Sequence, residues 1–256
     1  MEKKIVMVGA GNVATHIAQA LTDGGMCPVQ VWSRSEESAT ALASRIGSVS
    51  VTDINDIVSD ADIYIISVAD NALAEVIGRL CRNHHHGVFL HTAGTMPMDL
   101  FDGKAQHYGV LYPMQTFSKR KPLDFSEIPC FVEASDVLSL TAIKHIAGVL
   151  SNRVYELAGD DRRWLHVAAV FACNFSNACC AMAARLLEEH GLDFSMMLPL
   201  VDETTRKLHS LNPADAQTGP AARGDENVMD RHLSMLADHP DLQAIYKMIS
   251  EEIRKQ

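Results

Sequence analysis

A short apolar run that ends in two glycines most strongly restricts the fold of this chain. Residues 4–8 read Lys-Ile-Val-Met-Val, and Gly9-Ala10-Gly11-Asn12-Val13-Ala14 follows directly. Gly9 permits a tight turn, Gly11 leaves room for a pyrophosphate to reach the backbone, and Ala14 allows a helix to pack closely on the strand. The free N–H groups at the start of that helix, at Asn12 and Val13, favour an anion. The pattern predicts the opening of a dinucleotide-binding βαβ unit, although a Rossmann-like sheet that had lost its ligand would keep the same turn.

Strand-like and helical runs alternate up to residue 157. The strand-like runs cover residues 4–8, 29–33, 48–51, 62–68, 88–92, 107–111, 130–133 and 153–156. The runs with apolar residues three and four positions apart cover residues 13–21, 36–46, 71–81 and 137–150. Because such alternation is typical of parallel sheets, we expect an α/β fold with a Rossmann-like, doubly wound, mostly parallel sheet.

Only helical patterns follow residue 157. They cover residues 161–189, 194–211, 225–237 and 241–253. We therefore expect a Rossmann-like dinucleotide-binding domain at residues 1–157 and an all-helical domain at residues 158–256.

The end of the second strand, Trp32-Ser33-Arg34-Ser35, indicates which dinucleotide the turn would hold. An NAD site places an acidic residue here to bind the ribose hydroxyls, and this chain has none. The guanidinium of Arg34 and the hydroxyls of Ser33 and Ser35 suit a 2′-phosphate, so the sequence predicts NADP(H). In the alternative interpretation, Ser33 or Ser35 caps the helix that starts at Glu36 and Arg34 is merely solvated.

Residues that directly follow the parallel strands are the next candidates, because ligands lie outside the carboxyl ends of such strands. Val68, Ala69 and Asp70 follow the fourth strand, and Thr92 follows the fifth, so we expect these four to contact the cofactor. His91 lies at the end of the fifth strand, where an imidazole could donate a proton or bind a carbonyl. Alternatively, backbone hydrogen bonds hold it.

Charge and cysteine content limit the class of partner. The 22 Lys and Arg residues against 32 Asp and Glu give a net charge of -10, which would repel a nucleic-acid backbone. The six cysteines show neither a CxxC pair nor zinc-like spacing, so we expect no metal and a reducing compartment.

The apolar start is too short for a signal peptide. Residues 164–182 are mostly apolar, but His166 and Asn174 interrupt them, so we expect a buried helix rather than a membrane span. We expect a cytoplasmic protein.

Five segments together resemble a known family. They are Gly9-Ala-Gly-Asn-Val-Ala14, Trp32-Ser-Arg-Ser35, His91-Thr-Ala-Gly94, Tyr112-Pro-Met-Gln-Thr-Phe-Ser118 and Gln217-Thr-Gly-Pro-Ala-Ala-Arg-Gly-Asp225. Over nearly its whole length the chain resembles the Rossmann-like NADP oxidoreductases that carry a C-terminal helical domain of unknown function. That group is similar in layout to pyrroline-5-carboxylate reductase and, more distantly, to the 6-phosphogluconate and β-hydroxyacid dehydrogenases. The resemblance implies an NADP-binding domain, a dimerising helical domain and a substrate cleft between them.

The long helical run departs from the β-hydroxyacid dehydrogenase pattern. In those enzymes a catalytic Lys precedes an Asn by four residues, whereas here Val170 precedes Asn174. Arg162, His166, Val170 and Asn174 are spaced to share one side of an α-helix. We take His166 and Asn174 as catalytic candidates. Alternatively, both side chains bond to backbone in an interdomain helix.

Two further loop segments supply candidates for substrate binding. Thr218 and Arg223 lie in the glycine- and proline-rich segment 217–225, where they could bind an anionic group, and Asp225 could cap the next helix. Thr218 is also a catalytic candidate. A rigid turn with a bond between Arg223 and Asp225 is the alternative. Gln115, in the segment after the sixth strand, is the remaining substrate-binding candidate.

These features predict an NADP(H)-dependent oxidoreductase that moves a hydride between nicotinamide and a small carbonyl or imine substrate in the interdomain cleft. A deazaflavin as second redox partner is a narrower variant of this reading. The competing hypothesis is a non-catalytic NADP-binding or nucleotide-sensing protein, motivated by the missing Lys. We also expect a homodimer through the C-terminal helices, since residues 164–182 and 229–249 offer more apolar surface than about 100 residues can bury alone.

Overall fold

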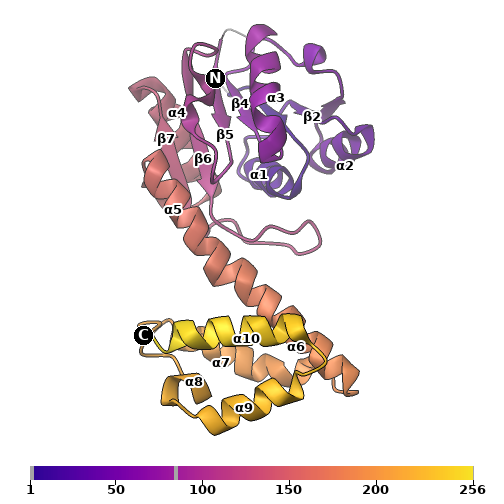
Figure 1. Cartoon of the computed structure of the whole chain (residues 1–256). Helices are drawn as coiled ribbons and strands as arrows, with labels where there is room; N and C mark the ends of the chain where they lie inside the picture. The colour runs from indigo at the N-terminus through magenta and orange to yellow at the C-terminus, as the bar shows by residue number, and fades with distance from the viewer. Residues whose placement is uncertain (1–2, 84–85, 256) are drawn as a thin grey trace. The chain divides into compact units, whose positions relative to one another are not determined.

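The computed structural model describes residues 3–83 and 86–255 (Figure 1). The chain divides into two compact units, Met1–Cys173 and Asn174–Gln256. The first unit therefore continues past residue 157 and takes in the first turns of the long helical run.

The first unit is built on one eight-stranded sheet in the order β3-β2-β1-β4-β5-β6-β7-β8. The strands are β1 (Ile5–Val8), β2 (Gln30–Trp32), β3 (Val49–Val51), β4 (Ile63–Ile66), β5 (Val88–His91), β6 (His107–Pro113), β7 (Cys130–Ala134) and β8 (Val154–Glu156). Every neighbouring pair is parallel except β6 and β7. The expected Rossmann-like, mostly parallel α/β sheet is confirmed. Across the sheet, the strand direction changes between β6 and β7.

Helices cover both faces of this sheet, as Figure 1 shows. The α-helices of the sheet region are α1 (Asn12–Asp23), α2 (Glu36–Ile46), α3 (Asp70–Asn83) and α4 (Val137–Leu150), and the 3-10 helices are η1 (Ile54–Asp56) and η2 (Met98–Phe101).

Alternate residues of β1 divide the buried side chains between two cores. Ile5 and Met7 pack in one core with side chains of α1, α2 and α4. Val6 and Val8 pack in the other with side chains of α3, η1 and η2. Because successive side chains of a strand point to opposite faces, each face of the sheet is apolar and is covered by helices. The strand ends are the part of the sheet that these helices do not cover.

The remainder of the described chain is helical. Its elements are α5 (Gly159–Ala169), the π-helix η3 (Val170–Phe175), α6 (Ser176–Glu189), η4 (Phe194–Met197), α7 (Leu198–Lys207), α8 (Pro220–Arg223), α9 (Glu226–Met235) and α10 (Pro240–Ile253). The short helix α8 lies within the segment that the sequence analysis took as a loop, and Asp225 caps α9 as expected, accepting a hydrogen bond from Val228 N at 3.2 Å.

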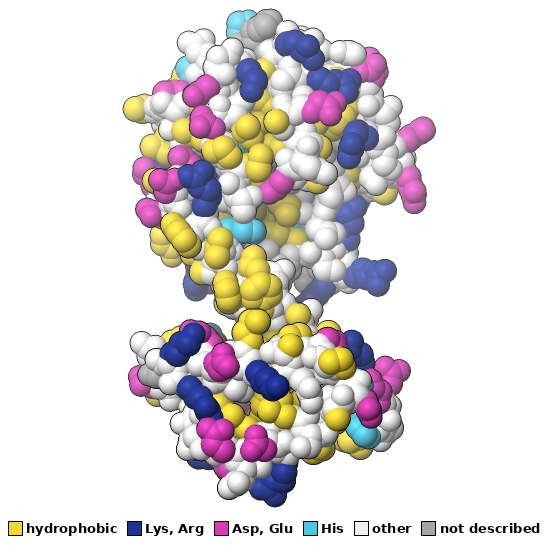
Figure 2. All heavy atoms as spheres, in the orientation of Figure 1, with side chains coloured by type: hydrophobic (Ala, Val, Ile, Leu, Met, Phe, Trp, Pro, Cys, Tyr) yellow, Lys and Arg dark blue, Asp and Glu magenta, His cyan; other side chains and the backbone are white. Residues whose placement is uncertain are grey.

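Two expectations about residues 161–189 were wrong. The run is helical, but the π-helix at Val170–Phe175 interrupts the α-helical period, so the spacing that was to align Arg162 with Asn174 does not hold. The stretch 164–182 is also not buried: Trp164 is 74% exposed and Val167 is 43% exposed. Figure 2 shows hydrophobic side chains gathered on the surface of this helix. Gly159–Glu189 is long and apolar enough to cross a membrane by length and composition.

Candidate functional site

A cavity of about 600 Å³ lies at the carboxyl ends of the parallel strands in the first unit. It is lined by segments 9–13, 32–34, 67–70 and 92–94, together with Ser38, Ala72, Val76, Tyr112, Pro113, Gln115, Phe117, Lys119 and His166. We call it the strand-end cavity. Its position is the one that doubly wound sheets use for ligands.

The glycine turn forms the floor of this cavity. Gly9 has a φ of 127°, and a Cβ on it would lie 2.1 Å from the Ser67 carbonyl oxygen, so the close approach of β1 and β4 requires glycine. A Cβ on Gly11 would meet nothing within 4 Å, which leaves open space above the backbone. Helix α1 begins at Asn12 with no side-chain cap, so its first N–H groups remain available to an anion. Ala14 is fully buried in the core and does not line the cavity.

The residue pair after β2 includes Arg34, whose guanidinium lies at the cavity. Arg34 is exposed, lines the cavity and, within the described residues, forms no ion pair. Ser33 lines the cavity beside it. Ser35 instead caps α2, where its hydroxyl accepts from Ser38 N at 3.3 Å, so the capping alternative holds for this residue. Ser38 lines the cavity, although the sequence analysis did not single it out.

The ends of β4 and β5 form the opposite wall. Val68, Ala69 and Asp70 line the cavity, and the Asp70 carboxylate accepts from the Thr95 hydroxyl at 2.7 Å. The buried Thr92 hydroxyl donates to Ser67 Oγ at 2.9 Å, which ties the two strand ends together.

His91 does not line the cavity. Its ring is fully buried, Nδ1 accepts from Ala93 N at 3.2 Å, and Nε2 lies 3.4 Å from the Pro97 carbonyl oxygen. Burial, with the nearby Arg162 charge, lowers the pKa of His91 to about 3, so the ring is neutral at pH 7. This environment matches the backbone-held alternative, and the histidine supports the loop after β5 rather than facing a ligand.

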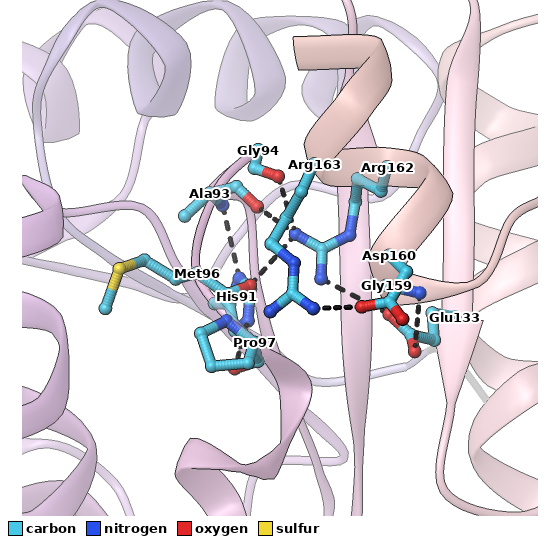
Figure 3. Close-up of polar contacts among 10 residues, drawn as sticks. All are labelled: His91, Ala93, Gly94, Met96, Pro97, Glu133, Gly159, Asp160, Arg162 and Arg163. Atoms are coloured by element: carbon cyan, nitrogen blue, oxygen red, sulfur yellow. Dashed lines mark hydrogen bonds and ion pairs between the residues drawn. The ribbon is translucent and has the colours of Figure 1, made fainter. Parts of the chain in front are cut away.

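Arg162 is the principal support of the same loop, as Figure 3 shows. Its side chain is 1% exposed, and Nη1 donates to the carbonyls of Ala93, Gly94 and Met96 at 2.8 to 2.9 Å. Nη2 lies 3.3 Å from the Glu133 carboxylate. One guanidinium from α5 therefore holds three carbonyl groups of a loop whose residues 92–94 line the cavity.

Tyr112 and His166 meet over Gly94. The Tyr112 hydroxyl lies 3.0 Å from His166 Nδ1, and both side chains line the cavity. Burial raises the pKa of Tyr112, so its hydroxyl stays protonated at neutral pH. The pair therefore brings a hydroxyl that can donate a hydrogen bond to the wall of the cavity. His166, a catalytic candidate from the sequence, thus lines the cavity, whereas the sequence analysis gave Tyr112 no role of its own.

Three of the four remaining candidates belong to the second unit. Asn174 is exposed in the π-helix, and Arg223 is exposed at the end of α8. Thr218 lines a mostly apolar cavity of about 400 Å³ formed by α6, α8, α9 and α10. Gln115 lines the strand-end cavity of the first unit.

The residues that the sequence analysis missed come from distant segments. Lys119 enters the cavity from the loop between β6 and β7, and Arg162 reaches the loop after β5 from α5. The only signal for Lys119 in the sequence is the basic run Lys119-Arg120-Lys121 directly after the motif that ends at Ser118.

Both halves of the chain match known protein families. Residues 4–91 match the family described as NADP oxidoreductase, coenzyme F420-dependent, and residues 128–253 match a domain of unknown function, DUF2520. A crystal structure of a candidate NADP oxidoreductase from Bacteroides fragilis is 48% identical, with a TM-score of 0.96 over 100% of this chain and 99% of that chain. No curated protein matched.

Two more distant structures share the fold. A reductive aminase from Aspergillus terreus, in complex with NADPH and ethyl levulinate, is 15% identical with a TM-score of 0.74, covering 98% of this chain and 93% of that chain. A pyrroline-5-carboxylate reductase from Coxiella burnetii is 15% identical with a TM-score of 0.62, covering 100% of each chain.

Proposed function

Because the chain belongs to the family of NADP oxidoreductases that join this N-terminal domain to DUF2520, with NADP(H) as cofactor, we propose that it transfers a hydride between nicotinamide and a small carbonyl or imine compound. The observation that carries this proposal is the strand-end cavity, in which a glycine turn, an uncapped helix start and an Arg34 with no ion pair among the described residues lie together.

The residues present fit a phosphorylated dinucleotide. Open space above Gly11 admits a pyrophosphate, and the N–H groups at Asn12 and Val13 can bind it. Arg34, with Ser33 and Ser38, can bind a 2′-phosphate. Segment 68–70 and Thr92 supply the facing wall.

Bound NADPH would supply the hydride, and the chain's own residues would hold the substrate beside it. Tyr112, Gln115 and His166 are polar side chains that line the same cavity from β6, the following loop and α5, respectively. A carbonyl oxygen or imine nitrogen gains a proton when its carbon gains a hydride, so hydrogen-bond donors at this wall suit such a substrate. We propose Asn174, Thr218 and Arg223 as additional substrate-binding or catalytic residues contributed by the helical unit.

Isotope transfer tests the reaction. The protein is incubated with NADPH deuterated at C4 and a panel of cyclic imines, aldehydes and small ketones, and products are analysed by mass spectrometry. Deuterium in a reduced product supports the proposal. Tight NADPH binding without transfer to any member of the panel would favour the alternative, a nucleotide-sensing protein.

A deazaflavin is a second candidate for the hydride partner. The match of residues 4–91 to a family described as coenzyme F420-dependent favours it. The test incubates the protein with NADPH and oxidised coenzyme F420. Loss of the visible absorbance of the oxidised coenzyme, which reports its reduction, would identify this variant.

We propose further that the protein is a cytoplasmic homodimer whose C-terminal helices form the interface. The support is the exposed apolar surface of helix 159–189, which includes Trp164 and Val167. A second copy could cover this surface, and Arg162 and His166 on the same helix suit an aqueous site better than lipid.

A further inference from the structure

Lys119 reaches the glycine turn from a distant part of the chain. Its ammonium group donates to the Ala10 carbonyl oxygen at 2.7 Å, and Ala10 lies between Gly9 and Gly11. Lys119 belongs to residues 114–129, which connect β6 and β7 and which we call the β6–β7 loop. Figure 1 shows this loop leaving the sheet and running below α1.

The β6–β7 loop is attached to α1 immediately before Lys119. His16 Nε2 lies 3.0 Å from the Ser118 carbonyl oxygen, and the rings of His16 and Phe117 have centroids 5.4 Å apart. Phe117 also packs on the buried Phe125 at 5.8 Å. These contacts hold the loop at Phe117 and Ser118, before Lys119, and at Phe125, after it. The position of Lys119 beside the glycine turn therefore follows from the packing of its neighbours in the loop.

No carboxylate among the described residues pairs with Lys119. Within residues 3–83 and 86–255, Lys119 forms no ion pair, and neither does Arg34, the other Lys or Arg that lines the strand-end cavity. The one acidic lining residue, Asp70, accepts from Thr95. An ammonium has three donors, and a single carbonyl uses one of them. Two cations that form no ion pair with the described residues, in one cavity of a chain with net charge -10, indicate an anionic ligand.

We propose that Lys119 is a binding residue for the pyrophosphate of the dinucleotide, and that the β6–β7 loop straps the cofactor at the glycine turn. This inference rests on the proposed function, because it requires a dinucleotide in the strand-end cavity. Lys119 contacts the turn after β1, where the pyrophosphate of a dinucleotide lies, whereas Arg34 follows β2, where the 2′-phosphate lies. The two cations therefore differ in their effect on affinity. Arg34 favours NADPH over NADH, and Lys119 strengthens the binding of both cofactors.

Affinity measurements with both cofactors separate these duties. Dissociation constants for NADPH and NADH are measured by nucleotide fluorescence for the unmodified protein and for Lys119→Gln, Lys119→Arg and Lys121→Gln. We expect Lys119→Gln to weaken both cofactors by about tenfold or more and by similar factors, because a charge-assisted bond to the shared pyrophosphate is lost. Lys119→Arg keeps the charge and should restore most of the affinity.

Lys121→Gln is the matched control, because Lys121 is a similarly exposed lysine in the same loop and does not line the strand-end cavity. Its dissociation constants should stay within about twofold of the unmodified protein. Unchanged affinities in Lys119→Gln would overturn the inference. A loss confined to NADPH would overturn it as well, because Lys119 would then bind the 2′-phosphate. If the unmodified protein binds neither cofactor, the proposed function itself fails.

Discussion

Tyr112 and His166 form a hydrogen-bonded pair, with 3.0 Å between the Tyr112 hydroxyl and His166 Nδ1, and Gly94 leaves the space that the pair occupies. A Cβ on Gly94 would lie 2.6 Å from His166 Nδ1 and 3.0 Å from Tyr112 Cε2. The loop after β5 and helix α5 are therefore matched in shape at the cavity wall. The buried guanidinium of Arg162 holds them in this arrangement.

The change Gly94→Ala should destabilise the first unit by about 1 to 3 kcal/mol, because the added methyl group forces the His166 ring to move. Urea unfolding followed by fluorescence of the buried Trp32 measures this. Gly78→Ala in helix α3 is the control with the opposite sign. A Cβ there meets nothing within 4 Å, so it should raise stability by about 0.5 to 1 kcal/mol. Equal effects of the two changes would contradict the close packing at Gly94.

Arg162→Ala should cost about 3 kcal/mol or more of unfolding free energy. It removes a buried guanidinium that donates to three carbonyl groups and pairs with the Glu133 carboxylate, which keeps its hydrogen bond from Gly159 N. The neighbouring Arg163 pairs with Asp160 at the surface, so Arg163→Ala should cost less than about 1 kcal/mol. Comparable losses for both variants would show that the Arg162 contacts do not hold the loop.

The buried His91 predicts a pH dependence of stability. Its pKa is lowered to about 3 in the folded protein, while an unfolded histidine has a pKa near 6.5, so the unfolded chain binds the extra proton between these values. The contribution of His91 is therefore fully present above about pH 6.5 and is lost as the pH falls towards 3, by at most about 1.4 kcal/mol per pH unit.

Urea unfolding at pH 7.5, 6 and 5 measures this slope. His91→Asn should flatten it, whereas His145→Asn, at an exposed histidine of α4, should leave it unchanged. A slope that is the same in all three proteins would mean that His91 titrates normally.

The exposed helix 159–189 predicts the oligomeric state. We expect light scattering at micromolar concentration to give twice the 28.0 kDa of one chain, and Trp164→Glu to shift the protein towards the monomer. Val137→Glu, at another exposed apolar residue outside that helix, should leave the mass unchanged. A monomeric unmodified protein would refute the proposed dimer.

The sequence predicted the sheet well because its signals are local. All eight strands and the four helices that cover the sheet carry apolar residues at strand or helix spacing, and Gly9, Gly11 and Arg34 lie within three residues of the ends of strands β1 and β2. A period read over neighbouring residues is sufficient for each of these predictions.

The support of the site depends on contacts that local patterns do not contain. Lys119 lies 109 residues from Ala10, and Arg162 lies 69 residues from Ala93. His91 was expected to face a ligand because it ends a strand, but the loop after β5 folds back over its ring. The π-helix at Val170–Phe175 was missed because the same apolar residues also fit an α-helix.

The most direct test of the account compares the affinity of the unmodified protein for NADPH and NADH, with Arg34→Ala measured alongside. Arg34 lines the strand-end cavity without an ion-pair partner among the described residues, so a 2′-phosphate should gain about 1.5 to 3 kcal/mol from it. The account predicts that NADPH binds about 10-fold to 150-fold more tightly than NADH and that Arg34→Ala removes most of this difference. Equal affinity of the unmodified protein for the two cofactors would contradict it.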